Sequence, residues 1–217
     1  MSFVPKKQAY GAQINAVTLG TGEKAITIGG QNVMPFYSFD APIENAPKIG
    51  IEVSHNTASW TTPGLAELYA GCTTMAECAA KAATVPGVDF IALNFAAADP
   101  NGANRSTEDC VADAKAVAEV TDLPLVVLGC KNLEKDGELL SKLAEALQGK
   151  NVLIMAAKNE NYVIVLLNDC FPYRIACFGE VFIVVKIAVS IDYYSVIAVS
   201  FNNVFRPRKH RVTRSVV

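Results

Sequence analysis

The stretch VDFIALNFAAADPNGANRSTEDCVADAKAVAEVTDLPLVVLG, residues 88–129, contains a complete strand–helix–strand pattern. Residues 88–95 and 123–129 are apolar runs, as expected for strands that are buried on both faces of a parallel sheet. Between them, Ser106 followed by Asp109 predicts a helix start, because the serine oxygen accepts a free amide and the acid favours the positive end of the helix dipole. The buried stripe of this helix is expected at helical spacing, at Val111, Ala114, Val117 and Ala118.

The same alternation extends in both directions along the chain. Strands are expected at 48–53 and 151–157, and helices at 75–83 and 137–147, while residues 54–74 are expected to be irregular. The resulting order β-α-β-α-β-α-β is typical of a (β/α)₈ barrel or of an open doubly wound sheet. A nucleotide-binding open sheet usually carries Gly-x-Gly-x-x-Gly after its first strand. This chain has SHNTASW there, which favours the barrel.

Three segments with different sequence character are expected. Residues 1–47 form a β-rich N-terminal extension with short alternating runs and glycine-rich turns. Residues 48–162 form the first half of a (β/α)₈ barrel, with about four β/α units. Residues 163–217 form an atypical tail of β-branched and aromatic runs, without a helical pattern between them. The predicted fold class is therefore α/β, with a partial TIM-type barrel.

The charge of the chain changes sign at the start of the tail. Residues 1–162 carry 12 Lys or Arg and 18 Asp or Glu (net −6), whereas residues 163–217 carry 7 and 3 (net +4). Three interpretations stay open: the basic end RPRKHRVTR is a patch for an anionic partner, it is a solvated tail, or the segment is out-of-frame or foreign sequence. Charged residues interrupt the apolar runs, so none reaches the ~18 residues that a membrane span needs.

The overall composition argues against several function classes. The net charge of −2 predicts no general attraction to nucleic acid. None of the six cysteines belongs to a Cys-x-x-Cys pair, which gives little support to zinc or iron–sulfur binding. The opening MSFVPKKQAY lacks the apolar region of a signal peptide. A cytoplasmic protein with reduced thiols, no membrane association and no nucleic-acid partner is expected.

Residues 14–162 resemble a known family. The segments DFIALNFAAADPNGANRSTEDCVADAKAVAE, DLPLVVLGC and EKDGELLSKLAEALQGKNVLIMAAKNENY are similar to the small subunit of the corrinoid iron–sulfur protein, which is also called the delta subunit of the acetyl-CoA decarbonylase/synthase complex. The segments TLGTGEKAITIGG and MPFYSFDAPIENAPKIGIEV look like the opening of that family. The loop ADPNGAN and the segment EKDGELL are the most specific parts. Nothing after residue 162 matches.

The resemblance implies a heterodimer with a large subunit that carries a cobamide domain and a [4Fe–4S] cluster, so no iron–sulfur cluster is expected in this chain. A corrinoid shared with that partner is expected at the mouth of the barrel, in methyl transfer for acetyl-CoA synthesis or cleavage. Methyltransferase and acetyl-CoA synthase are expected as transient partners. The chain then acts as a non-catalytic subunit that caps the cobamide. The alternatives are a pterin-dependent methyltransferase barrel and a truncated, non-functional fragment.

The expected site lies on the loops that follow the strands, since barrels bind their ligands at the carboxyl ends of the strands. Asparagine side chains suit hydrogen bonds to the amide-rich periphery of a corrinoid, whereas metal coordination would call for histidines or thiolates. No catalytic residue and no metal ligand are expected. The predicted cofactor-binding residues are Asn94, Asp99, Asn101, Gly102, Asn104, Cys130, Asn132 and Asn159.

Several points stay open on the sequence alone. Asn101–Gly102 fits a plain tight turn as well as a binding loop. Glu52 could act as a general base but has no evident partner carboxylate, and His55 is expected to be structural or solvent-exposed. The resembling family usually has Gly-Cys-Gly where this chain has Gly-Cys-Lys131. Four identifiable strands out of eight would leave two open sheet edges.

Overall fold

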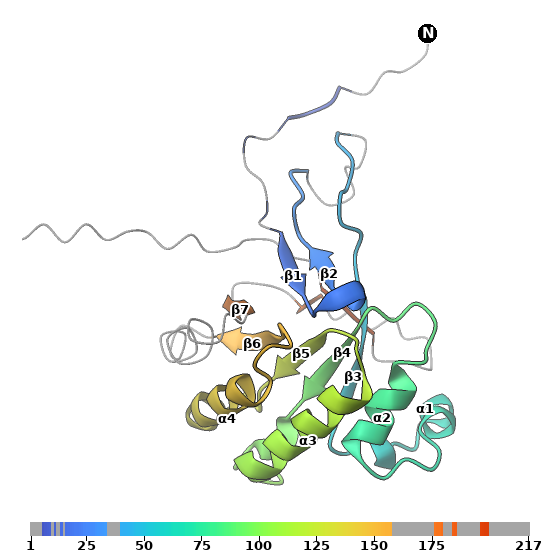
Figure 1. The fold of residues 1–217 in the computed structure, drawn as a ribbon, viewed down its shortest axis with the longest axis vertical. Coiled ribbons are helices and arrows are strands. Elements are labelled where there is room, and N and C mark those ends of the chain that lie inside the picture. Colours follow the sequence, from blue (N-terminus) through green and yellow to red (C-terminus); the bar gives the residue numbers. More distant parts are fainter. Residues whose placement is uncertain are drawn as a thin grey trace, which may run out of the picture.

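A computed structural model of the 217-residue chain describes residues 6–9, 11, 14, 16–33 and 40–157, together with three short strands in the tail. Its centre is a seven-stranded sheet with the order β7-β6-β5-β4-β3-β9-β8. Figure 1 labels its strands from β7 to β3. The four middle strands are mutually parallel: β3 (Ile49–Ser54), β4 (Phe90–Asn94), β5 (Leu125–Leu128) and β6 (Leu153–Ala157). The α/β class and the parallel arrangement of these strands are confirmed.

Strands from the tail pair with both outer edges of this parallel group. Strand β7 (Ala176–Gly179) runs parallel to β6, and β9 (Val196–Val199) runs antiparallel to β3. Strand β8 (Val184–Val185) then pairs antiparallel with β9. The two edges that the sequence pattern left open are therefore each paired. Among the described strands the sheet does not close on itself, so a barrel stays a prediction.

Four helices cover one face of the sheet (Figure 1). They are α1 (Pro63–Leu68), α2 (Met75–Ala82), α3 (Thr107–Val120) and α4 (Leu133–Ala146). The expectation that residues 54–74 are irregular was wrong, because this segment contains α1 and a 3₁₀ turn at Thr57–Ser59. Proline at the first position of α1 suits a helix start, since its missing N–H is not needed there.

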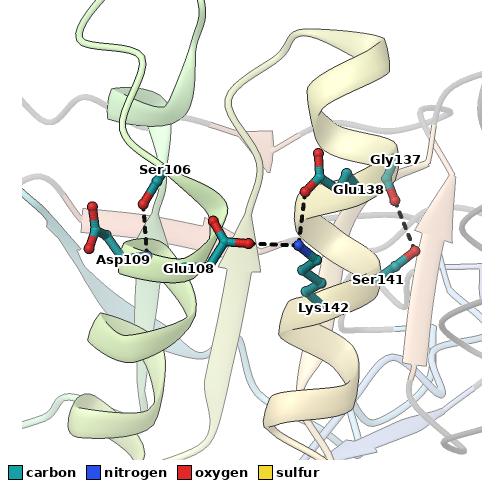
Figure 2. Close-up of polar contacts among 7 residues, drawn as sticks. All are labelled: Ser106, Glu108, Asp109, Gly137, Glu138, Ser141 and Lys142. Carbon is teal, nitrogen blue, oxygen red and sulfur yellow. Dashed lines mark hydrogen bonds and ion pairs between the residues drawn. The ribbon is translucent and has the colours of Figure 1, made fainter.

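Side-chain caps start the three longer helices. The predicted starts of α2 and α3 are confirmed, whereas α4 begins at Leu133 after its Asn132 cap and not at the predicted residue 137. Thr74 and Glu77 form a capping box at α2, and the Ser106 hydroxyl accepts the Asp109 N–H at 3.1 Å at α3 (Figure 2). The helices bury alanine, cysteine and leucine against the odd-numbered residues of β3, β4 and β5, such as Ile91. The predicted α3 stripe is confirmed at three of its four positions; Val111 is half-buried, and Cys110 is fully buried beside it.

The exposed surface of α3 and α4 carries an ion-pair bridge. Lys142 Nζ on α4 lies 2.8 Å from Glu108 Oε1 on α3 and 3.0 Å from Glu138 Oε1 one turn earlier (Figure 2). Lys142 holds the pKa values of both glutamates below their ordinary range through hydrogen bonds and charge. Because all three side chains are exposed, we expect this bridge to add little to the stability of the fold.

The N-terminal extension folds onto the other face of the sheet. Strands β1 (Val17–Leu19) and β2 (Ile26–Ile28) form an antiparallel hairpin on the side opposite the helices (Figure 1). Its buried side chains meet even-numbered residues of β4 and β5 and an odd-numbered residue of β6, in a cluster formed by Leu19, Ile28, Phe90, Ala92, Val126 and Leu153. Two short strands are thus described in this segment, and its extent as a separate N-terminal extension stays a prediction.

Asn151 anchors the hairpin to the end of the sheet where the parallel strands begin. Its side-chain amide donates to the backbone oxygens of Thr18 at 2.8 Å and Gly20 at 3.1 Å. Gly20 in turn lies against Pro124, just before β5. The hairpin is therefore fixed at the end of the sheet opposite the carboxyl ends of the strands. None of the helices in the described ranges is long and apolar enough to cross a bilayer.

Candidate functional site

The predicted site residues gather at the carboxyl edge of two neighbouring strands. The loop from β4 to α3 carries Asp99, Asn101, Gly102 and Asn104, and Asn94 ends β4 itself. The loop from β5 to α4 carries Cys130 and Asn132. Because β4 and β5 are paired in parallel, both loops leave the same edge of the sheet. Asn159 lies outside the described residues and stays a prediction.

Asn94 forms a polar pair with Glu52 on the neighbouring strand. The Asn94 side-chain amide donates to Glu52 Oε1 at 2.7 Å, and its carbonyl oxygen accepts the Ala96 N–H at 2.9 Å. Side chains alternate along a strand, so Asn94 points to the same face as Ala92, the face that the hairpin covers. The Glu52–Asn94 pair was missed from the sequence, although both residues stand near the ends of adjacent strands.

The β4–α3 loop is shaped by Asp99. Its backbone oxygen accepts the N–H groups of Gly102 at 2.9 Å and Asn104 at 3.0 Å. Its carboxylate accepts the Asn101 N–H at 3.0 Å and the Asn101 side-chain amide at 3.2 Å. Asn104 adopts a left-handed backbone with φ of 47°. The tight-turn interpretation is therefore right for the local structure, and Asn101, Gly102 and Asn104 remain exposed at its tip.

An ion pair ties the end of this loop to α3. The Arg105 guanidinium reaches Asp113 Oδ2 through two nitrogens, Nη2 at 2.8 Å and Nε at 3.2 Å. Both side chains are about three-quarters buried, with 25% and 23% of their surface exposed. Because two guanidinium nitrogens bond to this carboxylate, the contact fixes the orientation of the Arg105 side chain and is stronger than a single hydrogen bond. The ion pair therefore holds the end of the loop whose tip is exposed.

A buried carboxylate shapes the β5–α4 loop. Asp136, in the first turn of α4, is only 6% exposed and accepts two successive backbone N–H groups, from Cys130 at 2.6 Å and Lys131 at 3.0 Å. A Cβ on Gly129 would lie 2.3 Å from Asp136 Oδ1, so only glycine leaves room for the carboxylate. The Asn132 side chain accepts the Lys135 N–H at 3.1 Å and caps α4. Sequence reasoning placed Asn132 in the site but did not find Asp136.

Cys130 lies beneath the loop with 4% of its surface exposed. Burial raises the pKa of its thiol to about 11, and the nearby carboxylates of Asp136 and Asp99 add to the rise. A buried thiol with a raised pKa is much less reactive than an exposed one. Cys130 is thus a structural member of the site.

The buried thiols make the stability of the chain sensitive to alkaline pH. Burial raises the pKa of Cys110 to about 11 and that of Cys78 to about 12. Above pH 9 the unfolded state loses these protons while the folded state keeps them, so the free energy of unfolding falls as pH rises. We expect a loss of roughly 1 kcal/mol per buried thiol between pH 8 and pH 10, measured by urea unfolding. Cys110→Ala should reduce the loss; an unchanged pH dependence in this variant would contradict the assignment.

Lys131 occupies a strained backbone conformation with φ of 71°. Only glycine adopts such a conformation without cost. We expect Lys131→Gly to raise the free energy of unfolding by roughly 0.5–1 kcal/mol, measured by thermal or urea unfolding. Lys131→Ala removes the charge but keeps the strain, so an equal gain from alanine would assign the effect to charge instead.

The segment that contains both loops also matches a known protein family. The model of the CO dehydrogenase/acetyl-CoA synthase delta subunit family matches residues 16–168. The chain belongs to this family. Both loops of the site lie inside the delta-subunit match, and the family predicted from the sequence is confirmed.

Individual delta subunits are similar over the same region. The acetyl-CoA decarbonylase/synthase complex subunit delta of Archaeoglobus fulgidus is 30% identical over 162 residues, which cover 71% of this chain and 36% of the relative. The delta subunit of Methanothermobacter thermautotrophicus is 27% identical over 157 residues, covering 71% and 40%. That of Methanocaldococcus jannaschii is 23% identical over 167 residues, covering 74% and 41%. This delta-family chain therefore spans about two fifths of the length of these relatives.

The donor groups at the carboxyl edge suit a ligand rich in amides. Within the described ranges, no group of three or more His, Cys, Asp and Glu side chains could hold a metal ion. The exposed groups are instead the side chains of Asn101 and Asn104 and the ammonium of Lys131. Asparagine both donates and accepts hydrogen bonds, which matches carboxamide groups on a partner. The exposed edge therefore suits hydrogen bonds to carboxamide groups on a ligand or partner.

Proposed function

We propose that the carboxyl edge of this delta-family chain faces a corrinoid during methyl transfer in acetyl-CoA synthesis or cleavage. The observation that carries the proposal is the pair of adjacent loops, one presenting the exposed Asn101-Gly102 turn and Asn104, the other presenting Lys131. A large corrinoid iron–sulfur subunit holds the cofactor, and this chain closes over it. The methyltransferase and acetyl-CoA synthase approach the same complex transiently.

The residues have different parts in this proposal. Asn101 and Asn104 exchange hydrogen bonds with the carboxamide groups at the corrinoid periphery, and Gly102 leaves space for close approach. Asn94, Asp99, Cys130 and Asn132 keep the loops in shape, since their polar groups are already bonded within the chain or are buried. Asn159 lies after β6 and would extend the same edge. A bound corrinoid supplies a cobalt centre that accepts and gives up a methyl group; this chain supplies binding and shielding from water.

The fold proposal that accompanies this function is a partial (β/α)₈ barrel. In this proposal, residues 48–162 provide its first β/α units, and residues 1–47 form an N-terminal extension whose hairpin covers one face of the sheet. Residues 163–217 form an atypical tail, whose described strands β7 and β9 pair with the edges of the sheet. The parallel order β3-β4-β5-β6 with helices on one side supports it. A cytoplasmic location accords with the reduced cysteines of the described chain.

Binding of the full chain to the large corrinoid iron–sulfur subunit tests the function. We expect isothermal titration to give at least roughly tenfold tighter binding to the corrinoid-loaded subunit than to the corrinoid-free subunit. Asn101→Ala should weaken only the binding to the loaded subunit, by about fivefold for one lost hydrogen bond. Gln148→Ala removes an exposed amide at the opposite end of α4 and serves as the control. Equal affinity for the loaded and free subunits would overturn the proposal.

The Glu52–Asn94 pair favours one alternative, a barrel enzyme that binds a pterin and transfers its methyl group. A carboxylate and an amide on one face of the sheet can accept and donate hydrogen bonds at the edge of a pterin ring. Titration of methyltetrahydrofolate into the chain without any partner separates the two functions. Tight binding that is lost in Glu52→Gln would support the enzyme, and absence of binding would exclude it.

A further inference from the structure

Asp136 stands out among the acidic residues of the chain because it is buried and yet lies at a helix start. Glu134, in the same turn of α4, is exposed and already provides the negative charge that favours the helix dipole. Asn132 already caps the helix. Burial of a carboxylate is costly unless hydrogen bonds compensate for the lost water. The stability of α4 therefore does not explain why Asp136 is buried.

The two hydrogen bonds of Asp136 explain its position. Both go to the loop and not to the helix: Oδ1 accepts the Cys130 N–H at 2.6 Å and Oδ2 accepts the Lys131 N–H at 3.0 Å. With both N–H groups turned toward the carboxylate, the thiol of Cys130 is enclosed and the side chain of Lys131 is exposed. This arrangement forces Lys131 into a left-handed backbone conformation with φ of 71°. Such strain persists only where neighbouring groups hold it.

The loop held in this way also contacts its neighbours at the carboxyl edge. The Gly129 N–H donates to the backbone oxygen of Met155 on β6 at 3.2 Å. On the other side, the Phe95 N–H, where the β4–α3 loop begins, donates to the backbone oxygen of Leu128, where the β5–α4 loop begins, at 3.1 Å. A change in the β5–α4 loop would therefore alter the spacing between two loops of the candidate site.

We propose that Asp136 is a positioning residue for ligand binding: it presets the β5–α4 loop so that Lys131 stands beside the exposed asparagine loop while Cys130 is held inside. This inference rests on the proposed function. A loop that is preset by a buried group loses little freedom when a ligand binds, which favours affinity. Asp136 touches no ligand in this account and acts through the backbone of residues 130 and 131.

The test uses Asp136→Asn, which keeps the shape of the side chain but leaves one N–H without its acceptor. Glu134→Gln removes the same charge from the same helical turn and is the matched control. Thiol labelling with DTNB or iodoacetamide, followed by peptide mass spectrometry, reports on each cysteine separately. We expect Cys130 in Asp136→Asn to react at least roughly tenfold faster, while Cys78 and Cys110 stay protected because the core remains closed. Affinity for the corrinoid-loaded large subunit should fall about tenfold, with affinity for the corrinoid-free subunit unchanged.

Each outcome decides the inference. Unchanged labelling of Cys130, or a loop that opens without loss of affinity, would overturn it. If the wild-type chain does not distinguish the loaded from the free subunit, the proposed function fails, while the labelling still reports whether Asp136 shapes the loop. If Cys78 and Cys110 also react faster, the core of the Asp136→Asn variant has opened. Asp136→Asn is then combined with Lys131→Gly, which removes the backbone strain at position 131. This double variant, compared with Lys131→Gly alone, must then show the same selective exposure of Cys130.

Discussion

Gly50→Ala is expected to lower the free energy of unfolding by about 2–3 kcal/mol, as overpacked cores do. A Cβ at this position in β3 would lie 2.1 Å from Cε2 and 2.3 Å from Cζ of the Phe90 ring. Phe90 is 2% exposed and packs between the sheet and the hairpin, so its ring has little room to move. Urea unfolding at pH 7, followed by circular dichroism, measures the change.

A double-mutant cycle with Phe90→Leu identifies the cause. Leucine removes the ring atoms that the new methyl group would meet. The double variant should therefore lose less free energy of unfolding than the sum of the losses in the two single variants. We expect a coupling of about 1 kcal/mol or more, as found for residues in direct contact. Additive effects would show that Gly50 is needed for another reason. A single cooperative transition in these experiments would also count against a non-functional fragment.

Gly129→Ala is expected to lower the free energy of unfolding by about 3 kcal/mol, because the added Cβ would displace a carboxylate that accepts two hydrogen bonds. The Cβ would lie 2.3 Å from Oδ1 and 2.8 Å from Oδ2 of Asp136. Displacement would leave the N–H groups of Cys130 and Lys131 without their acceptor and a charge buried without compensation. The free energy of unfolding from urea titration measures this effect, and exposure of Cys130 to thiol reagents should accompany it.

Gly102→Ala is the matched control in the neighbouring loop. An added Cβ at Gly102 would find its nearest atom, the backbone oxygen of Asp99, at 3.6 Å, which is ordinary van der Waals distance. We expect the free energy of unfolding to change by less than about 0.5 kcal/mol, as for most exposed positions. Equal losses for the two glycines would mean that the close approach at Asp136 is not what requires glycine at position 129.

The regular elements of the parallel sheet could be predicted because each has a local signal. Apolar runs mark β4 and β5, and Ser106 at α3 caps its helix as expected. Helix α1 was missed because its six residues begin with Pro63-Gly64 and are too short to show a buried stripe. The pairing of β7 and β9 with the sheet edges was not predicted either, since strand partners in a tail of similar β-branched runs have no local signature.

The candidate site could be located from the sequence but not explained by it. The end of each apolar run placed Asn94, Asp99 and Cys130 at one edge, because parallel strands share their direction. The internal contacts were not visible: Asn94 meets Glu52 across 42 residues, and Asp136 reaches back to Cys130 across a loop.

Hydrogen–deuterium exchange on the assembled complex tests the central claim most directly. The full chain is compared alone, with the corrinoid-free large subunit and with the corrinoid-loaded large subunit. If the carboxyl edge faces the corrinoid, peptides covering residues 99–105 and 129–132 gain protection only with the loaded subunit, while the hairpin at 17–28 is unchanged between the two complexes. Corrinoid-dependent protection confined to the hairpin or to the outer surfaces of α3 and α4, or no dependence on the corrinoid, would contradict the account.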